Sequence, residues 1–206
     1  MTFSKCRVEG CAKKAVFLTE YCFEHQNNKD KMIDEIYSFI KSNNDINGYN
    51  FSFVPFDNFD FSNKNISFSM FSRCSMKNTD FSHSVMLSNF FDFSDMEKSK
   101  FNDSLIKFIV FGGANLTLSD FTEANIFSSN FLGARIDNAL FKNADFSYSR
   151  FIGNNLENAS FNNCNLKNTY FQDANFDEIT LKTSNYQDAI LINCYGKSCK
   201  IEGANL

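Results

Sequence analysis

The sequence predicts an all-β solenoid, in which the chain winds into stacked coils with four sides. Every fifth residue from Phe51 to Leu206 is large and apolar at 31 of 32 positions, the exception being Gly196. The residue two positions before each of these is Ala, Ser, Thr or Cys in 24 of the 32 cases. A helix requires an apolar period near 3.6 and a strand a period of 2, so a period of five indicates neither a helix nor an ordinary strand.

The inward positions repeat every 20 residues, which indicates four sides. Residues two apart in an extended segment share a face, so the large and the small residue of each unit both point inward, and the polar pair that follows turns a corner. The series from Phe51 to Phe171 and from Phe61 to Phe161, taken in steps of 20, consist of Phe alone, and the positions between them are mostly aliphatic. A coil of three or five units would scramble this order.

This pattern resembles that of the pentapeptide repeat proteins, whose units centre on Leu or Phe preceded by Ala and Asp or Asn. Typical units here are "ADF" at 144–146 and "ANL" at 114–116. The resemblance covers about residues 47–206 and implies a right-handed quadrilateral β-helix of about eight coils, with residues 46–206 taken as the repeat domain.

Residues 1–28 lie outside the repeat and predict a metal site. Cys6, Cys11, Cys22 and His25 follow a C-x4-C-x10-C-x2-H pattern. Four such ligands suit a tetrahedral structural Zn²⁺, which would supply the folding energy that so short a segment lacks. The segment resembles zinc knuckles found beside nucleases and other DNA-handling proteins. Unbound reduced thiols remain an alternative, as does a catalytic role, although four protein ligands leave no open position for a reactive water.

The other cysteines have a simpler interpretation, because each takes the small inward position of the repeat. They are Cys74, Cys164, Cys194 and Cys199.

Residues 29–45 predict an α-helix that caps the rod, because the terminal coil of a solenoid otherwise exposes its core. Asp30 is the expected N-cap. The helix is expected to lie across the first coil, where larger residues replace the small one. Its apolar stripe comprises Met32, Ile33, Ile36, Tyr37, Phe39 and Ile40, and the replacements are Tyr49, Val54, Phe59 and Lys64.

We expect no comparable cap at the C-terminal end, because the repeat is still in register at Leu206. Ile201 and Leu206 are therefore expected to form an interface at this end. An end-to-end homodimer, which the family resemblance implies, is the first oligomer to test.

The sequence offers no arrangement typical of catalysis. "FGGAN" at 111–115 fits the repeat register rather than a phosphate loop, and His83 falls at an outward position. A smooth rod has little pocket for a substrate, so we expect neither enzymatic activity nor a small-molecule substrate. The net charge of −4 gives no reason to expect nucleic-acid or lipid binding. With no long apolar run and no apolar leader, the sequence predicts a cytoplasmic protein that does not contact membranes.

One outward face of the repeat is apolar where water would favour polar residues, and such patches usually mark interfaces. The alternative is that these side chains fold over the corners and cover the rod locally. We call this set the outer apolar face. It comprises Phe68, Met70, Val85, Leu87, Phe90, Leu105, Phe108, Val110, Phe127 and Tyr148.

Three functions follow as hypotheses. The leading one is a protein-binding scaffold with an unknown partner. The family resemblance implies a second, a DNA mimic that regulates DNA gyrase or another topoisomerase, but residues 46–206 carry 17 acidic and 13 basic residues, a net charge of only −4. The third is nucleic-acid binding through the zinc segment, whose cations are otherwise a solvated surface. These cations are Lys5, Arg7, Lys13 and Lys14.

Overall fold

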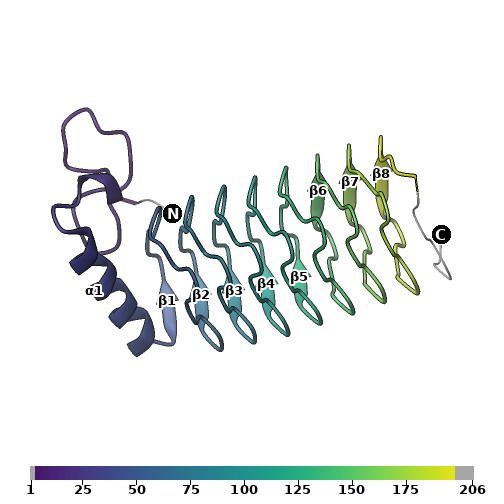
Figure 1. The fold of residues 1–206 in the computed structure, drawn as a ribbon, viewed down its shortest axis with the longest axis horizontal. Coiled ribbons are helices and arrows are strands. Elements are labelled where there is room, and N and C mark those ends of the chain that lie inside the picture. Colours follow the sequence, from purple (N-terminus) through teal and green to yellow (C-terminus); the bar gives the residue numbers. More distant parts are fainter. Residues whose placement is uncertain (1–2, 198–206) are drawn as a thin grey trace.

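The computed structural model describes residues 3–197, which form a rod of stacked coils with a helix across one end (Figure 1). A short 3-10 helix, η1 (Phe23–His25), precedes the α-helix α1 (Lys29–Ser42). The rod makes about seven turns, fewer than the eight expected, since the last nine residues lie outside the described part. Its strands are β1 (Asp45–Asn47), β2 (Asn65–Ser67), β3 (Val85–Leu87), β4 (Leu105–Lys107), β5 (Asn125–Phe127), β6 (Arg150–Ile152), β7 (Tyr170–Gln172) and β8 (Ile190–Ile192).

The coils have the predicted length of 20 residues. All paired strands run parallel with this offset, so that Ile46 lies opposite Ile66 and Ile66 opposite Met86. Isolated bridges repeat the same offset between strands, as at Pro55 and Ser75. The quadrilateral β-helix predicted by the period of five is therefore confirmed.

The core contains two columns of stacked phenylalanine rings. The centroids of Phe61 and Phe81 lie 4.9 Å apart with rings 8° from parallel, and those of Phe71 and Phe91 lie 4.9 Å apart at 6°. The two columns meet edge to face, as between Phe61 and Phe71 at 90°. Both arrangements are ones that aromatic pairs favour, so the interior is filled by ordered contacts.

The small inward residue also ties successive coils together. The hydroxyl of Thr79 donates to the carbonyl of Phe56 at 2.9 Å, and the thiol of Cys74 donates to the carbonyl of Phe51 at 3.1 Å. Each bond reaches a carbonyl in the preceding coil. Ser, Thr and Cys suit this position because they are small and also satisfy a buried acceptor.

The corners of the rod use left-handed backbone, a feature that the period of five did not predict. Every fifth residue from Gly48 to Asn193 has a positive φ. Asn and Gly adopt this conformation with the least strain, which explains their frequency there. Phe53, Phe68 and Phe108 adopt it too, although it is disfavoured for bulky side chains.

The named strands change sides midway along the rod (Figure 1). Strands β1–β5 form one sheet and β6–β8 a second, with the change after β5. On the side of the first sheet, the carboxylate of Asp145 accepts a 2.8 Å bond from the amide of Ser147. This Asx turn replaces the strand that the register would otherwise continue.

Helix α1 covers the first coil, as predicted. Met32, Ile36 and Ile40 are buried, and the ring of Tyr37 lies 4.8 Å from that of Phe59. Among the described residues, no helix has the length and apolar character needed to cross a membrane.

The predicted N-cap of α1 was wrong. Asn28 caps the helix, because its side-chain oxygen accepts a 3.0 Å bond from the amide of Lys31. Asp30 instead lies in the first turn, where its negative charge still favours the positive end of the helix dipole.

Candidate metal centre and interaction surfaces

The structure brings the four predicted metal ligands together. The ligand atoms of Cys6, Cys11, Cys22 and His25 all lie within 4.8 Å of one another. The Nδ1 atom of His25 is 3.3 Å from the sulfur of Cys6 and 3.4 Å from that of Cys22. The sulfurs of Cys11 and Cys22 are 3.9 Å apart.

These spacings fit a tetrahedral zinc ion. Zn–S bonds of about 2.3 Å and Zn–N bonds of about 2.0 Å place neighbouring ligand atoms roughly 3.5–3.8 Å apart. These three separations lie close to that range, and the remaining ligand atoms are within 4.8 Å of one another. With four protein ligands, the site would be a structural one that leaves no position for substrate.

The local electrostatics also favour metal binding. Burial raises the pKa of the Cys6 thiol, but backbone hydrogen bonds at Cys22 and Val8 and the side chains of His25 and Cys22 outweigh it and lower this pKa to about 6. The thiolate is the form that binds a metal. In the core, by contrast, burial raises the pKa of Cys164 to about 12, so that cysteine stays an inert thiol.

The cysteine segment is attached to the rod rather than hanging free. The amide of Phe17 donates to the carbonyl of Asn50 at 2.7 Å, and the side-chain amide of Asn50 donates to the carbonyl of Ala15 at 2.7 Å. The Phe17 ring packs 5.9 Å from Phe51 and 5.1 Å from Phe39. The cysteine segment and α1 therefore both cover the first coil.

The cations predicted as a solvated surface fall into two groups. Arg7 pairs with Glu20, and Lys13 pairs with Glu24. Lys5 and Lys14 face each other across an antiparallel bridge, and within residues 3–197 neither ammonium forms an ion pair.

The residues of the outer apolar face differ in exposure. Phe68, Val85, Phe108 and Tyr148 are exposed, with 42–51% of their surface accessible. The other six are partly covered. Phe127 links two exposed neighbours, since its ring centroid lies 6.0 Å from Phe108 and 5.3 Å from Tyr148. An aromatic ladder thus runs along the outside of the rod near β4 and β5.

The outer apolar face is bounded by polar residues. In the column through β2–β5, Val85 and Leu105 are flanked by Asn65 on one side and Asn125 on the other. In this column the apolar stretch is therefore limited to two coils.

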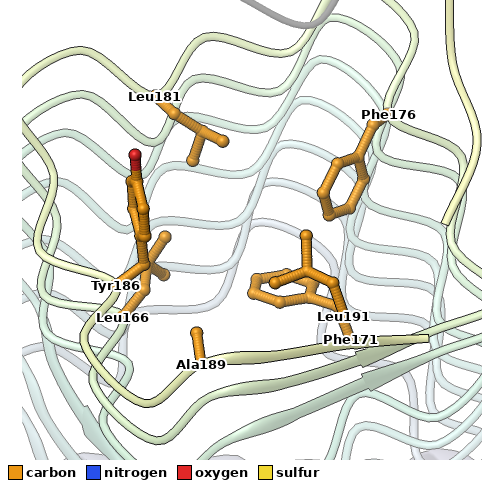
Figure 2. A pocket seen from close by; sticks show the side chains of 7 residues that line it. All are labelled: Leu166, Phe171, Phe176, Leu181, Tyr186, Ala189 and Leu191. Atoms are coloured by element: carbon orange, nitrogen blue, oxygen red, sulfur yellow. The ribbon is translucent and has the colours of Figure 1, made fainter. Parts of the chain in front are cut away.

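A second apolar surface lies in the last described coils. A pocket of about 80 Å³ lies in the last coils, where Tyr186 faces Phe176 across the opening (Figure 2). The Tyr186 hydroxyl is buried and has no hydrogen-bond partner among the described residues. Ile201 and Leu206, predicted to form the end interface, lie outside these residues. The pocket is lined by Leu166, Phe171, Phe176, Leu181, Tyr186, Ala189 and Leu191.

Comparison with protein families identifies the repeat. The family model described as "Pentapeptide repeats" matches residues 108–143 and 144–182, with eight copies. The period of five extends beyond this match, back to Phe51. No curated protein matches the chain.

Solved structures share the fold. Two trypsin-treated variants of QnrB1, a plasmid-mediated fluoroquinolone resistance protein, match with TM-scores of 0.51 and 0.53 at 18% identity. Each match covers 71% of this chain and 82% of the other. HetL, a pentapeptide repeat protein involved in heterocyst differentiation in the cyanobacterium Nostoc, matches at 14% identity with a TM-score of 0.39, over 87% of this chain and 97% of its own.

Proposed function

The chain carries pentapeptide repeats, and on that premise we propose that it is a non-enzymatic scaffold that presents its outer apolar face to a protein partner. The single observation that carries this proposal is the grouping of exposed large side chains on one face, two of them at strained corners. Phe68 and Phe108 have positive φ and are 43% and 50% exposed. A polar residue would relieve both the strain and the exposure, so their presence favours a binding role.

The scaffold includes a metal-stabilised end. We assign Zn²⁺ to Cys6, Cys11, Cys22 and His25 on the basis of ligand type and spacing. Its role is structural, because it would order the segment that is hydrogen-bonded to Asn50 of the rod through Ala15 and Phe17. The domain division proposed is 1–28 for this segment, 29–45 for the helix and 46–206 for the rod.

The charge distribution favours a scaffold over a DNA mimic. Mimicry requires a strongly acidic rod, but residues 46–206 carry a net charge of only −4, and some of the acidic side chains pair with cations. The Nζ atom of Lys77 lies 3.1 Å from the carboxylate of Asp95, and the Nε atom of Arg135 lies 3.8 Å from that of Asp137. A gyrase partner is retained as the alternative, supported only by the shared fold.

The test compares two exposed residues that share one local conformation. Phe108 and Leu118 both have positive φ, near 60°, and are 50% and 46% exposed, but only Phe108 lies on the outer apolar face. A photo-crosslinking amino acid is placed at each position in the full chain. We expect a discrete adduct, with a partner or a second copy, from position 108 and none from position 118.

The substitutions Phe108→Asn and Leu118→Asn complete the comparison. Both should leave the free energy of unfolding within about 1 kcal/mol of the parent, since surface changes are usually small. With the crosslinker moved to the neighbouring Phe127, whose ring centroid lies 6.0 Å from that of Phe108, only Phe108→Asn should abolish the adduct. Equal crosslinking from the two positions would refute the proposed face, as would a loss of stability of core size for Phe108→Asn.

A further inference from the structure

A pocket lies between the cysteine segment and the first coils of the rod, where the repeat alone predicted none. It has a volume of about 280 Å³, near the lower bound of small-molecule sites. The expectation that a smooth rod has little pocket concerned the repeat alone, and residues 13–23 add a wall that the repeat does not contain. The lining residues are Lys13, Lys14, Val16, Cys22, Phe23, Asn50, Ser52, Phe53, Met70, Ser72 and Arg73.

The two walls of this pocket are held in place by the protein itself. Ala15 and Phe17, which flank Val16, are hydrogen-bonded to Asn50 at 2.7 Å each. Asn50 is itself buried and belongs to the first coil, whose backbone pairs with the next coil at Met70. The cavity is thus preformed, which lowers the cost of ordering that a ligand must overcome.

The lining is cationic although the chain as a whole is acidic. Three of the eleven lining residues are Lys or Arg, and none is Asp or Glu. Lys13 is already paired with Glu24, and its ammonium would also balance the excess negative charge of a zinc ion held by three thiolates. Within residues 3–197, the charged groups of Lys14 and Arg73 have no carboxylate partner. The carboxylate of Asp92 is held by the hydroxyl of Ser72 at 2.7 Å.

The remaining lining offers an apolar surface rather than free hydrogen-bonding groups. Val16, Phe23, Phe53 and Met70 supply the apolar side chains. The hydroxyl of Ser52 is already used, since it donates to the side-chain oxygen of Asn50 at 2.6 Å. The Lys14 ammonium and the Arg73 guanidinium are therefore the donors that remain for a ligand.

Two aromatic rings lie beside cations of the pocket, and one of them, Phe53, lines the pocket. The guanidinium of Arg73 lies 4.7 Å from the ring centroid of Phe93, and the ammonium of Lys13 lies 5.4 Å from that of Phe53. Phe53 has a φ of 69°, which is strained for a large residue and places its ring at the pocket. A flat ligand body would contact Phe53 while its charge meets Arg73.

We propose that this pocket binds a small organic anion, an aromatic ring that carries a phosphate group. The phosphate would lie against Lys14 and Arg73, which suits a phosphate because guanidinium groups bind it in a bidentate manner. The ring would pack on Phe53 and Met70. This chemistry occurs in free aryl phosphates and in phosphotyrosyl side chains, and the site shares only Met70 with the outer apolar face.

Calorimetric titration of the full chain with three probes tests the pocket. Phenyl phosphate carries both features, inorganic phosphate lacks the ring, and phenol lacks the charge. We expect phenyl phosphate to bind about tenfold or more tightly than either of the others, as loss of a charge-assisted contact implies. Equal affinity for all three, or no binding of phenyl phosphate at millimolar concentration, would overturn the proposal.

Matched variants locate the binding. Lys14→Ala and Arg73→Ala should each weaken phenyl phosphate binding about tenfold. Two controls should not: Lys5→Ala, opposite Lys14 but outside the pocket, and Arg150→Ala, whose guanidinium also lies over a ring, that of Tyr170. All four side chains are exposed, so the fold should survive. Unchanged binding in the Lys14→Ala/Arg73→Ala double variant would refute the assignment.

A phosphotyrosyl peptide distinguishes the two sources of the ligand. Tighter binding of the peptide than of phenyl phosphate would support the proposed chemistry with a protein side chain as its source. Exclusion of the peptide while phenyl phosphate binds would support a free small molecule. Peptide binding that persists in the Arg73→Ala variant would count against the pocket.

Discussion

Truncation of Phe111 tests whether the stacked aromatic columns hold the rod together. Its side chain is fully buried, and its ring centroid lies 5.5 Å from Phe91 and 5.0 Å from Phe131 in stacked pairs. It also meets Phe101 and Phe121 edge to face at 5.9 Å and 6.2 Å. The Phe111→Ala variant removes all four ring contacts and leaves a cavity in the middle of the column.

The expected cost can be estimated from these contacts. Burial of a Phe side chain contributes about 1.5–3 kcal/mol, and each favourable aromatic pair adds about 0.5–1.5 kcal/mol. Partial collapse of the cavity offsets some of this loss, so we expect destabilisation of about 3–5 kcal/mol, as core Phe truncations show. A two-state treatment of a long repeat array is open to failure, so a local measurement is required as well.

Denaturant unfolding combined with amide hydrogen exchange provides the measurement. Because each coil contacts only its neighbours, exchange should accelerate most in the coils of Phe91, Phe111 and Phe131, and least near β1. Phe108→Ala, three residues away but half exposed, is the matched control and should change stability by less than about 1 kcal/mol. Similar values for the two variants would show that residue 111 does not point inward and would refute the four-sided register.

Two further predictions concern the cysteines. Native mass spectrometry should find one zinc ion per chain, lost on chelation and in the Cys22→Ser variant but kept in Cys74→Ser. Chelation should also accelerate hydrogen exchange of the Phe17 amide and leave exchange in β4 unchanged, because metal binding stabilises only the folded segment. A zinc-free chain would contradict the assignment. The free energy of unfolding of Cys74→Ser should stay within about 1 kcal/mol of the parent, because the hydroxyl of Ser99 already donates the equivalent bond to the carbonyl of Met76 at 2.9 Å. Thermal denaturation measures this difference. A large loss of stability would mean that the position cannot accept a hydroxyl.

Much of the fold could be predicted from the sequence because it is encoded locally and repeatedly. Each five-residue unit specifies its own inward pair, so the alignment of Phe51 with Phe71 follows from counting. The capping helix and the grouping of Cys6, Cys11, Cys22 and His25 were equally accessible, since a 3.6-residue stripe and a ligand spacing are both local patterns. The left-handed corners also left a signal, because Asn or Gly occupies 13 of the 30 corner positions from Gly48 to Asn193.

The sequence by itself thus determined the register, the inward Phe columns and the candidate ligands. Only the tertiary structure decided how the non-repeating segment meets the rod. Ala15 and Phe17 are hydrogen-bonded to Asn50, and Lys14 and Arg73 line the same pocket. The partners in these pairs are 33 to 59 positions apart in the sequence. No period relates these residues. Their meeting depends on how a unique segment packs against the first coil, and such packing is specified by the assembled surfaces rather than by spacing along the chain.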